Sequence, residues 1–290
     1  MKYAFLILHY NTIEETVKSV QSIVDNCVND DYSIVIVDNA STNDSYSEMQ
    51  SMYDNNDKII LIHNKQNLGF ANGNNVGIDF IKKELDVDFI IMMNNDVYLT
   101  DIYFLKKIET IFHKYSFGVL GPMIKTPDGR CDTNPFGENN YTLEGINVTI
   151  SYCKKQIKLI DTHLKCIYDF LINIKLKIKN HNKEKVKDYK HIKKDVPLHG
   201  SCLILSKLFL DKIEGLDTRT FMYGEEAILF VKCLGENVLS MYSPEIEVFH
   251  NEHATVDKEV KNRKQQRFFY ENLLKSSLVL RDVYLEYQDK

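Results

Sequence analysis

Short apolar runs alternate with amphipathic stretches through the first hundred residues of the chain. The runs have the length of buried strands and occupy residues 3–8, 33–37, 59–63 and 89–93. The stretch that follows the first run, residues 12–26, places its apolar side chains on one helical face, formed by Val17, Val20, Ile23 and Val24. This alternation is typical of βαβ units. We therefore predict an α/β fold with a mainly parallel, Rossmann-like sheet and helices on both faces.

The pattern continues beyond residue 100. A helix is predicted at residues 101–115 and a strand at residues 119–124, followed by a turn at Pro127-Asp128-Gly129. Further short strands are predicted at residues 203–205 and 238–242. The chain ends in a helix predicted from about residue 258 onward.

The stretch between residues 139 and 194 differs from the rest in composition, because it is rich in lysine. Its apolar residues recur at helical spacing: Ile157, Ile160, Leu164, Ile167, Tyr168, Leu171, Ile174 and Ile178. This pattern predicts a basic amphipathic helix or helix pair. Such a helix packs on the protein core, lies on an anionic membrane surface or forms a dimer contact. We favour packing, because most amphipathic helices of globular chains bury their apolar stripe in protein.

The net charge, the cysteine spacing and the N-terminal apolar run bear on which class of protein this is. A net charge of -5 gives no reason to expect nucleic-acid binding. The six cysteines show no Cys-x-x-Cys spacing, which favours free thiols in a reducing compartment. The N-terminal apolar run is too short for a signal peptide or a membrane span. We expect a cytoplasmic protein, either free or peripheral at the inner face of the plasma membrane.

Polar side chains follow each predicted strand of the first half. They are Tyr10-Asn11-Thr12, Asp38-Asn39, residues 64–75 and Asn94-Asn95-Asp96. Ligands of open parallel sheets bind beyond the carboxyl ends of the strands, so we expect a binding site there. The carboxylate of Asp96 is a hard oxygen ligand of the kind that Mg²⁺ or Mn²⁺ takes. The alternative interpretation is a turn residue that caps the next helix.

Glycines and amides are concentrated in residues 67–77, which open a predicted helix. Glycines let backbone N–H groups approach a ligand closely, and amide side chains suit a sugar or a base. The segment has neither the Gly-x-x-x-x-Gly-Lys nor the Gly-x-Gly-x-x-Gly pattern. An ordinary surface loop is the alternative.

Together these segments resemble a known family. They are Ile7-Leu8-His9-Tyr10-Asn11, residues 35–45, residues 67–75 and Met93-Asn94-Asn95-Asp96. In order and spacing they are similar to the donor half of inverting family 2 glycosyltransferases of the GT-A type, particularly rhamnosyltransferase-like members. The later segments His199-Gly200-Ser201-Cys202, Gly215-Leu216-Asp217, residues 221–226 and Val248-Phe249-His250 resemble acceptor-side motifs of the same family.

The resemblance implies a division of labour along the chain. Residues 1–125 would bind a UDP- or dTDP-sugar, residues 126–250 would hold the acceptor and the catalytic groups, and residues 251–290 would form a helical segment. It implies that Asp38 contacts the uracil or thymine, with Thr12 and Asn39 nearby. Three further asparagines would line the donor pocket: Asn67, Asn72 and Asn75.

The resemblance also implies a metal site. Asn94-Asn95-Asp96 occupies the family's Asp-x-Asp position, so Asp96 is its one carboxylate. It would hold Mg²⁺ or Mn²⁺ on the donor diphosphate with the help of His250, although a strand-end or core histidine is the alternative. An amide in place of the first carboxylate lowers the expected affinity for the metal.

An inverting transfer needs one base to take the proton of the acceptor hydroxyl. Glu226 stands where the family has the aspartate of a Glu-Asp pair, so we predict Glu226 as the base and Glu225 as the alternative. Adjacent carboxylates repel, which raises a pKa when the site is buried. Both acids also suit the first turn of a helix, and that structural role is compatible with catalysis.

The expected function is transfer of a hexose or a deoxyhexose such as rhamnose to a carbohydrate acceptor, free or lipid-linked, in bacterial capsule, O-antigen or cell-wall assembly. Two alternatives stay open. A nucleotidyltransferase would need a basic glycine-rich loop after the first strand, where His9-Tyr10-Asn11-Thr12 offers none. A non-enzymatic carbohydrate-binding protein would not need Asp96, Glu226 and His250 to converge.

Overall fold

The computed structural model describes residues 1–28, 30–136, 141–165, 168–169, 188–252 and 262–288. Within these ranges, nine strands form one mixed sheet in the order β3-β2-β1-β4-β8-β6-β9-β5, and β7 pairs with β9. The strands are β1 (Tyr3–His9), β2 (Tyr32–Asp38), β3 (Ile59–His63), β4 (Phe89–Asn94), β5 (Val97–Leu99), β6 (Val119–Lys125), β7 (Lys193–Lys194), β8 (Cys202–Ser206) and β9 (Ser240–His250).

The four strands predicted in the first hundred residues all form and are parallel neighbours. Strand β1 pairs in parallel with both β2 and β4, and β2 pairs in parallel with β3. Their register places His9 opposite Asp38 and Asp38 opposite His63. The polar residues that follow these strands therefore share one edge of the sheet, as predicted.

The second half of the chain completes the same sheet. Strand β8 is antiparallel to both β4 and β6, whereas β6 and β9 are parallel. The short strand predicted at residues 238–242 is the beginning of the much longer β9, which continues to His250. The predicted boundary at residue 125 thus lies within a continuous sheet. The assignment of donor binding to residues 1–125 and of acceptor binding to residues 126–250 stays a prediction.

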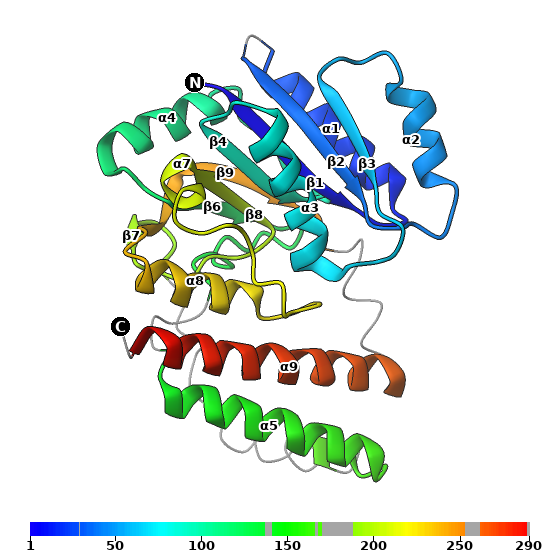
Figure 1. The fold of residues 1–290 in the computed structure, drawn as a ribbon, viewed down its shortest axis with the longest axis vertical. Helices are drawn as coiled ribbons and strands as arrows, with labels where there is room; N and C mark the ends of the chain where they lie inside the picture. Colours follow the sequence, from blue (N-terminus) through cyan, green and yellow to red (C-terminus); the bar gives the residue numbers. More distant parts are fainter. Residues whose placement is uncertain (29, 137–140, 166–167, 170–187, 253–261, 289–290) are drawn as a thin grey trace.

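Helices cover both faces of the sheet (Figure 1). They are α1 (Ile13–Asn26), α2 (Ser45–Tyr53), α3 (Gly69–Glu84), α4 (Phe104–Tyr115), α5 (Leu143–Asp161), α7 (Lys207–Leu210), α8 (Glu225–Gly235) and α9 (Arg263–Gln288). Helices α1 and α4 bury apolar side chains such as Ile23 and Ile108 in one core. Helices α3 and α8 contribute Ile78 and Leu229 to a second core on the other face.

Helix α9 lies between α8 and α5 and forms a third layer (Figure 1). Its side chains Leu280 and Val283 share an apolar cluster with Ile146 and Ile150 of α5 and with Ile228 of α8. Helix α5 therefore packs on protein through Ile146 and Ile150. Of the predicted stripe, Ile160 is buried near the end of α5 at Asp161, whereas residues 167, 171, 174 and 178 lie outside the described residues, so packing of the whole stripe stays a prediction.

None of the described helices combines the length and apolar character required to cross a bilayer.

The glycines of α3 have a packing role that differs from the predicted ligand approach. Gly73 and Gly77 lie inside the helix and face the sheet, where a Cβ at Gly77 would stand 2.1 Å from Leu6 Cδ1 and 3.1 Å from Val37 Cγ2. Only Gly69, with a φ of 77°, adopts a conformation that favours glycine. These glycines bring α3 close to β1 and β2 and so fix the wall of the carboxyl edge.

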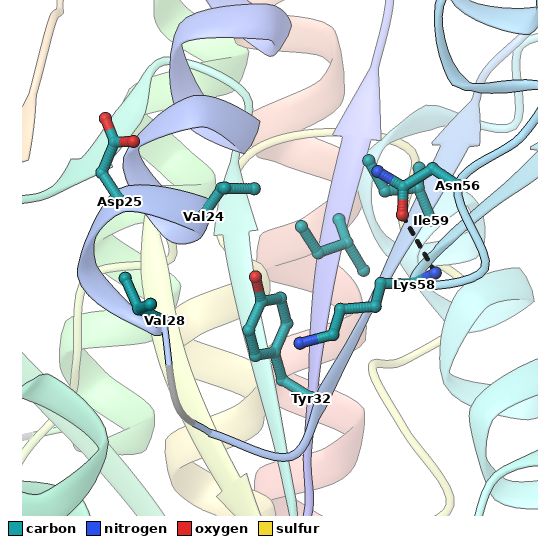
Figure 2. A pocket seen from close by; sticks show the side chains of 8 residues that line it. Val24, Asp25, Val28, Tyr32, Asn56, Lys58 and Ile59 are labelled. Atoms are coloured by element: carbon teal, nitrogen blue, oxygen red, sulfur yellow. Dashed lines mark hydrogen bonds between the residues drawn. The ribbon is translucent and has the colours of Figure 1, made fainter.

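A hollow of about 460 Å³ lies at the opposite edge, beside the beginnings of β2 and β3 (Figure 2). It is lined by Val24, Asp25, Val28, Tyr32, Ile34, Asn56, Lys58 and Ile59. The ammonium of Lys58 lies 4.1 Å from the centroid of the Tyr32 ring. None of the predicted site residues lines this hollow.

Close packing of α3 on the sheet gives a stability prediction. Gly77→Ala should lower the free energy of unfolding by about 2 kcal/mol relative to Gly145→Ala, because the added methyl overpacks a filled core. Gly145 is the matched control, since it is an exposed helical glycine whose Cβ would meet only Thr142 Oγ1, at 3.3 Å. The chain has no Trp, so urea unfolding is best followed by circular dichroism. Equal effects of the two substitutions would contradict the packing role.

Candidate active site

A cavity of about 510 Å³ opens at the carboxyl edge of the sheet. Nine of the residues predicted for the site line it: Thr12, Asn39, Asn67, Asn94, Asn95, Asp96, Glu225, Glu226 and His250. They come from the ends of β1, β2, β4 and β9, from the loop before α3 and from the beginning of α8. The fold therefore brings together residues that are more than two hundred positions apart.

Two pairings of strands produce this convergence. Met93 of β4 is paired with Cys202 of β8, so the residues after β4 meet the residues before β8, and the N–H of Asn94 donates to the carbonyl of Ser201 at 2.8 Å. Val97 of β5 is paired with His250 of β9, which places the end of β9 beside Asp96. Backbone pairing thus fixes the positions of these side chains.

Asp96 and His250 form the predicted metal pair. Both side chains are buried, and the Asp96 Oδ1 atom lies 3.2 Å from His250 Nε2. The other ring nitrogen of His250, Nδ1, is buried without a hydrogen-bond partner. A carboxylate oxygen and an imidazole that face one cavity fit a divalent cation that takes its remaining ligands from diphosphate and water.

Protein side chains alone do not complete a coordination shell here. No group of three or more His, Cys, Asp or Glu side chains is arranged around a common metal position in the residues that the structure describes. This agrees with the single carboxylate of Asn94-Asn95-Asp96. A cation at this place would depend on its diphosphate ligand, as Mg²⁺ commonly does.

Asn95 holds the Asn94-Asn95-Asp96 segment in place through hydrogen bonds to the beginning of α1. Its amide nitrogen donates to Thr12 Oγ1 at 2.7 Å and to Thr16 Oγ1 at 3.0 Å. The same Thr16 hydroxyl lies 2.6 Å from the Nδ1 atom of His9, which is fully buried. Burial lowers the pKa of His9 against the opposing effect of the Asp38 carboxylate. Asn95 and Thr12 therefore line the cavity while they hold β4 to the start of α1.

Asn39 and Asn67 form an amide network at the end of β2. The Asn39 amide nitrogen donates to Asn67 Oδ1 and to the Gly69 carbonyl, each at 3.1 Å. Its oxygen accepts from the Leu68 N–H at 3.0 Å and from Asn64 Nδ2 at 3.2 Å. These bonds fix the loop that enters α3 and leave it as a wall of the cavity.

Asp38 lies at the end of β2 but does not line the cavity. Its carboxylate is buried, accepts from the Ser41 N–H at 3.2 Å and lies 2.8 Å from His63 Nδ1. The ring of Tyr46 stands 4.3 Å from the His63 ring, centroid to centroid. A base contact of Asp38 stays a prediction.

Asn72 and Asn75 also lie outside the cavity. The amide of Asn75 exchanges two hydrogen bonds with the backbone of Leu216, at 2.8 and 2.9 Å, and Asn72 donates to the Thr218 carbonyl at 3.1 Å. The structure gives both side chains a bracing role between α3 and the segment before α8. A donor contact of either residue stays a prediction.

The segment before α8 is held by the buried carboxylate of Asp217, which is paired with two cationic side chains. Asp217 accepts from Arg219 at 2.8 Å and from the Lys232 ammonium at 2.9 Å. Burial raises the pKa of Asp217, but these charged hydrogen bonds outweigh it and hold the pKa far below its usual range. The loop that delivers Glu225 and Glu226 is therefore anchored at both ends.

Helix α8 begins at Glu225, after Gly224 with a φ of 87°. Both acids occupy its first turn, so the structural role expected for them is confirmed, and both also face the cavity. Burial and the neighbouring Glu226 raise the pKa of Glu225 to about 7, and its Oε1 atom is buried without a partner. Burial likewise raises the pKa of Glu226, whose side chain is partly exposed to the cavity. A carboxylate with a pKa near neutrality suits a general base.

Other lining residues were not singled out as site residues by the sequence. They are Leu8, Tyr10, Gly69, Phe70, His199, Gly200, Ser201, Met222, Tyr223 and Glu252. Most of them belong to the motifs quoted above, and membership of a motif could have identified them as lining residues. Glu252 lies outside every motif, and it is held by Arg130, whose Nη2 atom is 2.6 Å from the Glu252 carboxylate. Only the folded chain brings residues 130 and 252 together.

Solved structures resemble this fold. S. aureus TarS 1-349 in complex with UDP superposes with a TM-score of 0.53 at 12% identity and covers 99% of this chain and 71% of that one. GalNAc-T7 with UDP, GalNAc and Mn²⁺ gives a TM-score of 0.56 at 11% identity and covers 87% of this chain and 44% of that one. In another TarS structure this chain spans 37% of the neighbour. These likenesses show the fold and confirm the predicted GT-A type α/β architecture.

Sequence comparisons point in the same direction. The low-salt glycan biosynthesis hexosyltransferase Agl10 of Haloferax volcanii is 25% identical over 251 residues, which cover 86% of this chain and 67% of Agl10. The model of glycosyl transferase family 2 matches residues 5–175, which is more than half of the chain. The match includes β1 to β4 and Asp96, the strands and the carboxylate around which the cavity is built. The chain therefore belongs to glycosyl transferase family 2 and is a glycosyltransferase.

Proposed function

We propose that the protein transfers a sugar from a UDP- or dTDP-sugar to a hydroxyl group of a carbohydrate acceptor, with inversion at the anomeric carbon. The observation that carries the proposal is that Asp96, His250 and the pair Glu225 and Glu226 line one cavity. The related structures support the donor class, since TarS is described in complex with UDP and with UDP-GlcNAc. The relative named as a hexosyltransferase supports sugar transfer.

Glu226 acts as the base in this proposal. Its carboxylate takes the proton of the acceptor hydroxyl while that oxygen bonds to the anomeric carbon. The bond between the anomeric carbon and the diphosphate oxygen breaks, and the nucleoside diphosphate leaves from the opposite face. Glu225, buried beside it, has a pKa raised to about 7 by burial and by Glu226, and it is the alternative base.

Asp96 and His250 would hold Mg²⁺ or Mn²⁺ at the diphosphate. Bound there, the cation neutralises the charge that develops on the leaving diphosphate. The Mn²⁺ in the GalNAc-T7 structure supports this assignment. The backbone pairing of β5 with β9 keeps both side chains in place.

The finer assignments are a hexose or deoxyhexose such as rhamnose, and a place in capsule, O-antigen or cell-wall assembly. They rest on the resemblance of motifs alone. The uracil or thymine contact of Asp38, the lipid-linked acceptor, the peripheral membrane contact and a homodimer have the same standing as proposals. The acidic net charge of -5 gives no support to a nucleic-acid substrate.

Both alternatives find less support. The loop after β1 carries no glycine, lysine or arginine between His9 and Thr12 to bind a triphosphate. A carbohydrate-binding protein has no use for a buried carboxylate with a pKa near 7. We therefore retain sugar transfer.

A donor panel tests the proposal. Purified protein with Mn²⁺ should release nucleoside diphosphate from at least one UDP- or dTDP-sugar. Asp96→Ala and Glu226→Gln should each reduce the rate by about 100-fold or more, the usual effect of losing a charge-stabilising or general-base group. Asp54→Ala and Glu48→Gln are matched controls, because both side chains are exposed and Glu48 lies in the first turn of α2. Full activity in both site variants would overturn the assignment.

The pH profile of transfer tests the coupling of the two acids. A base must be ionised, so kcat/KM should fall on the acid side of the profile, and burial of Glu226 places this fall above the usual pKa of a glutamate. Glu225→Gln removes a like charge beside Glu226 and makes its ionisation easier. The acid limb should therefore move to lower pH in this variant. A limb that stays in place, or moves to higher pH, contradicts the coupling.

Stability gives a readout that needs no substrate. The folded-state pKa of Glu225 is raised from 4.5 to about 7, so the carboxyl destabilises the fold increasingly as the pH rises between these values. Glu225→Gln should therefore stabilise the protein more at about pH 8 than at about pH 5. The expected difference is about 2 kcal/mol by linkage. Equal effects at both pH values, measured by urea unfolding, would show that the carboxyl is not perturbed.

A further inference from the structure

Gly200 lies directly against the carboxyl group of Glu226. A Cβ atom at position 200 would stand 2.9 Å from Glu226 Oε1 and 3.3 Å from both Cδ and Cγ. The φ of Gly200 lies outside the left-handed region, so alanine tolerates its backbone conformation. The absence of a side chain at this position is therefore a matter of space beside the glutamate.

The backbone around Gly200 has little freedom to move away. On one side the N–H of His199 donates to Asn134 Oδ1 at 3.1 Å. On the other side the carbonyl of Ser201 accepts from the N–H of Asn94 at 2.8 Å. The strand that follows is paired with both β4 and β6.

Helix α8 is equally constrained. Ala227 and Ile228, the residues after Glu226, are buried in the apolar cluster with α5 and α9. A Cβ at the preceding Gly224 would stand 3.2 Å from Ser276 Cβ of α9, so that end of the helix is close to α9 as well. The backbones on both sides of this contact are therefore constrained, and only the Glu226 side chain is able to move.

We propose that Gly200 is a positioning residue for Glu226: its bare backbone sets where the carboxylate lies and leaves room for a side chain of glutamate length. The inference rests on the proposed role of Glu226 as the base. Any side chain at position 200 would displace the carboxyl group while it leaves both backbones in place. Gly200 thus controls the geometry of proton removal through the position of Glu226.

The contact also has an electrostatic side. A hydrogen bond from the Gly200 backbone lowers the pKa of Glu226 against the larger effect of burial. Two other titratable groups face this carboxyl, Glu225 on α8 and Tyr141 ahead of α5, whose pKa is raised to about 12 by burial and by the charge of Glu226. Displacement of the carboxylate from Gly200 should therefore raise the pKa of Glu226 further.

Gly200→Ala tests the inference. The atoms that yield are the end of a flexible side chain, so the urea midpoint should change little, and UDP should bind with unchanged affinity in the presence of Mn²⁺. The kcat for the donor identified in the panel should fall about 10- to 100-fold with an unchanged donor KM, because misplacing a catalytic group by about 1 Å has effects of this size. Gly145→Ala is the control and should behave as the parent protein.

Shortening the base provides the decisive comparison. Glu226→Asp removes the closest contact, the 2.9 Å approach to Oε1, so the methyl of Gly200→Ala displaces the shorter carboxylate less. Gly200→Ala should then cost less than about 2-fold in the Glu226→Asp background, whereas it costs about 10-fold or more beside the native glutamate. Such non-additivity is the mark of two residues in contact. Equal costs in both backgrounds would overturn the positioning role.

A titration separates this inference from the proposed function. In protein with ¹³C-labelled glutamate side chains, assigned through Glu226→Gln, the Glu226 carboxyl signal should titrate at higher pH in Gly200→Ala than in the parent. An unchanged titration overturns the contact whatever the activity. If no donor is turned over by the parent protein, the proposed function fails, and the titration still decides whether Gly200 positions the carboxylate.

Discussion

The pairing of β4 with two neighbours of opposite direction is the constraint on which the site depends. Parallel β1 brings the polar residues that follow it to the carboxyl edge, and antiparallel β8 starts at that same edge. One strand end is therefore flanked by Thr12 on one side and by Gly200 and Ser201 on the other. A parallel strand in the place of β8 would begin at the far edge of the sheet. It would leave the acids of α8 without the wall against which Glu226 rests.

This arrangement gathers buried polar groups around the cavity, and most of them form hydrogen bonds with other protein groups. The amides of Asn39, Asn67 and Asn95 are bonded to backbone or to hydroxyl groups. Among the described residues, the few buried side-chain atoms without partners include Glu225 Oε1 and His250 Nδ1, which belong to residues that line the cavity. Unsatisfied buried groups are costly, so their presence in two residues of one cavity is more readily explained by function than by folding.

The sequence predicted the parallel half of the fold because each of those strands has its own apolar run and its own turn residues. It did not predict β5 or β7. Both are very short strands whose existence depends on pairing with β9. Pairing between distant segments leaves no local signal. The predicted Lys-rich helix or helix pair is described only in part: α5 ends at Asp161, and most of the predicted stripe beyond it lies outside the described residues, so its extent stays a prediction.

The site residues divide in the same way. Asp96, Glu225, Glu226 and His250 were recognisable because their chemistry and order match a known motif. Asn72 and Asn75 carry the same amide as Asn39, yet they bond to the segment before α8, and nothing local distinguishes a bracing amide from a lining one. Glu252 has no motif and reaches the cavity through a contact with Arg130. Sequence patterns therefore identify which groups have suitable chemistry, whereas long-range pairing decides which of them face the cavity.

In the first turn of α8, a structural preference for acidic residues coincides with the catalytic role proposed for them. Two acids at a helix N-terminus are favoured by the helix dipole, which stabilises their charge. Burial acts in the opposite direction and outweighs the dipole at Glu225, since its pKa rises to about 7. The cost of burying Glu225 is offset in the neighbouring loop by Asp217, whose two cationic partners keep it ionised. A strongly paired carboxylate thus stabilises the segment that presents a weakly paired one, and the weakly paired one is free to exchange a proton.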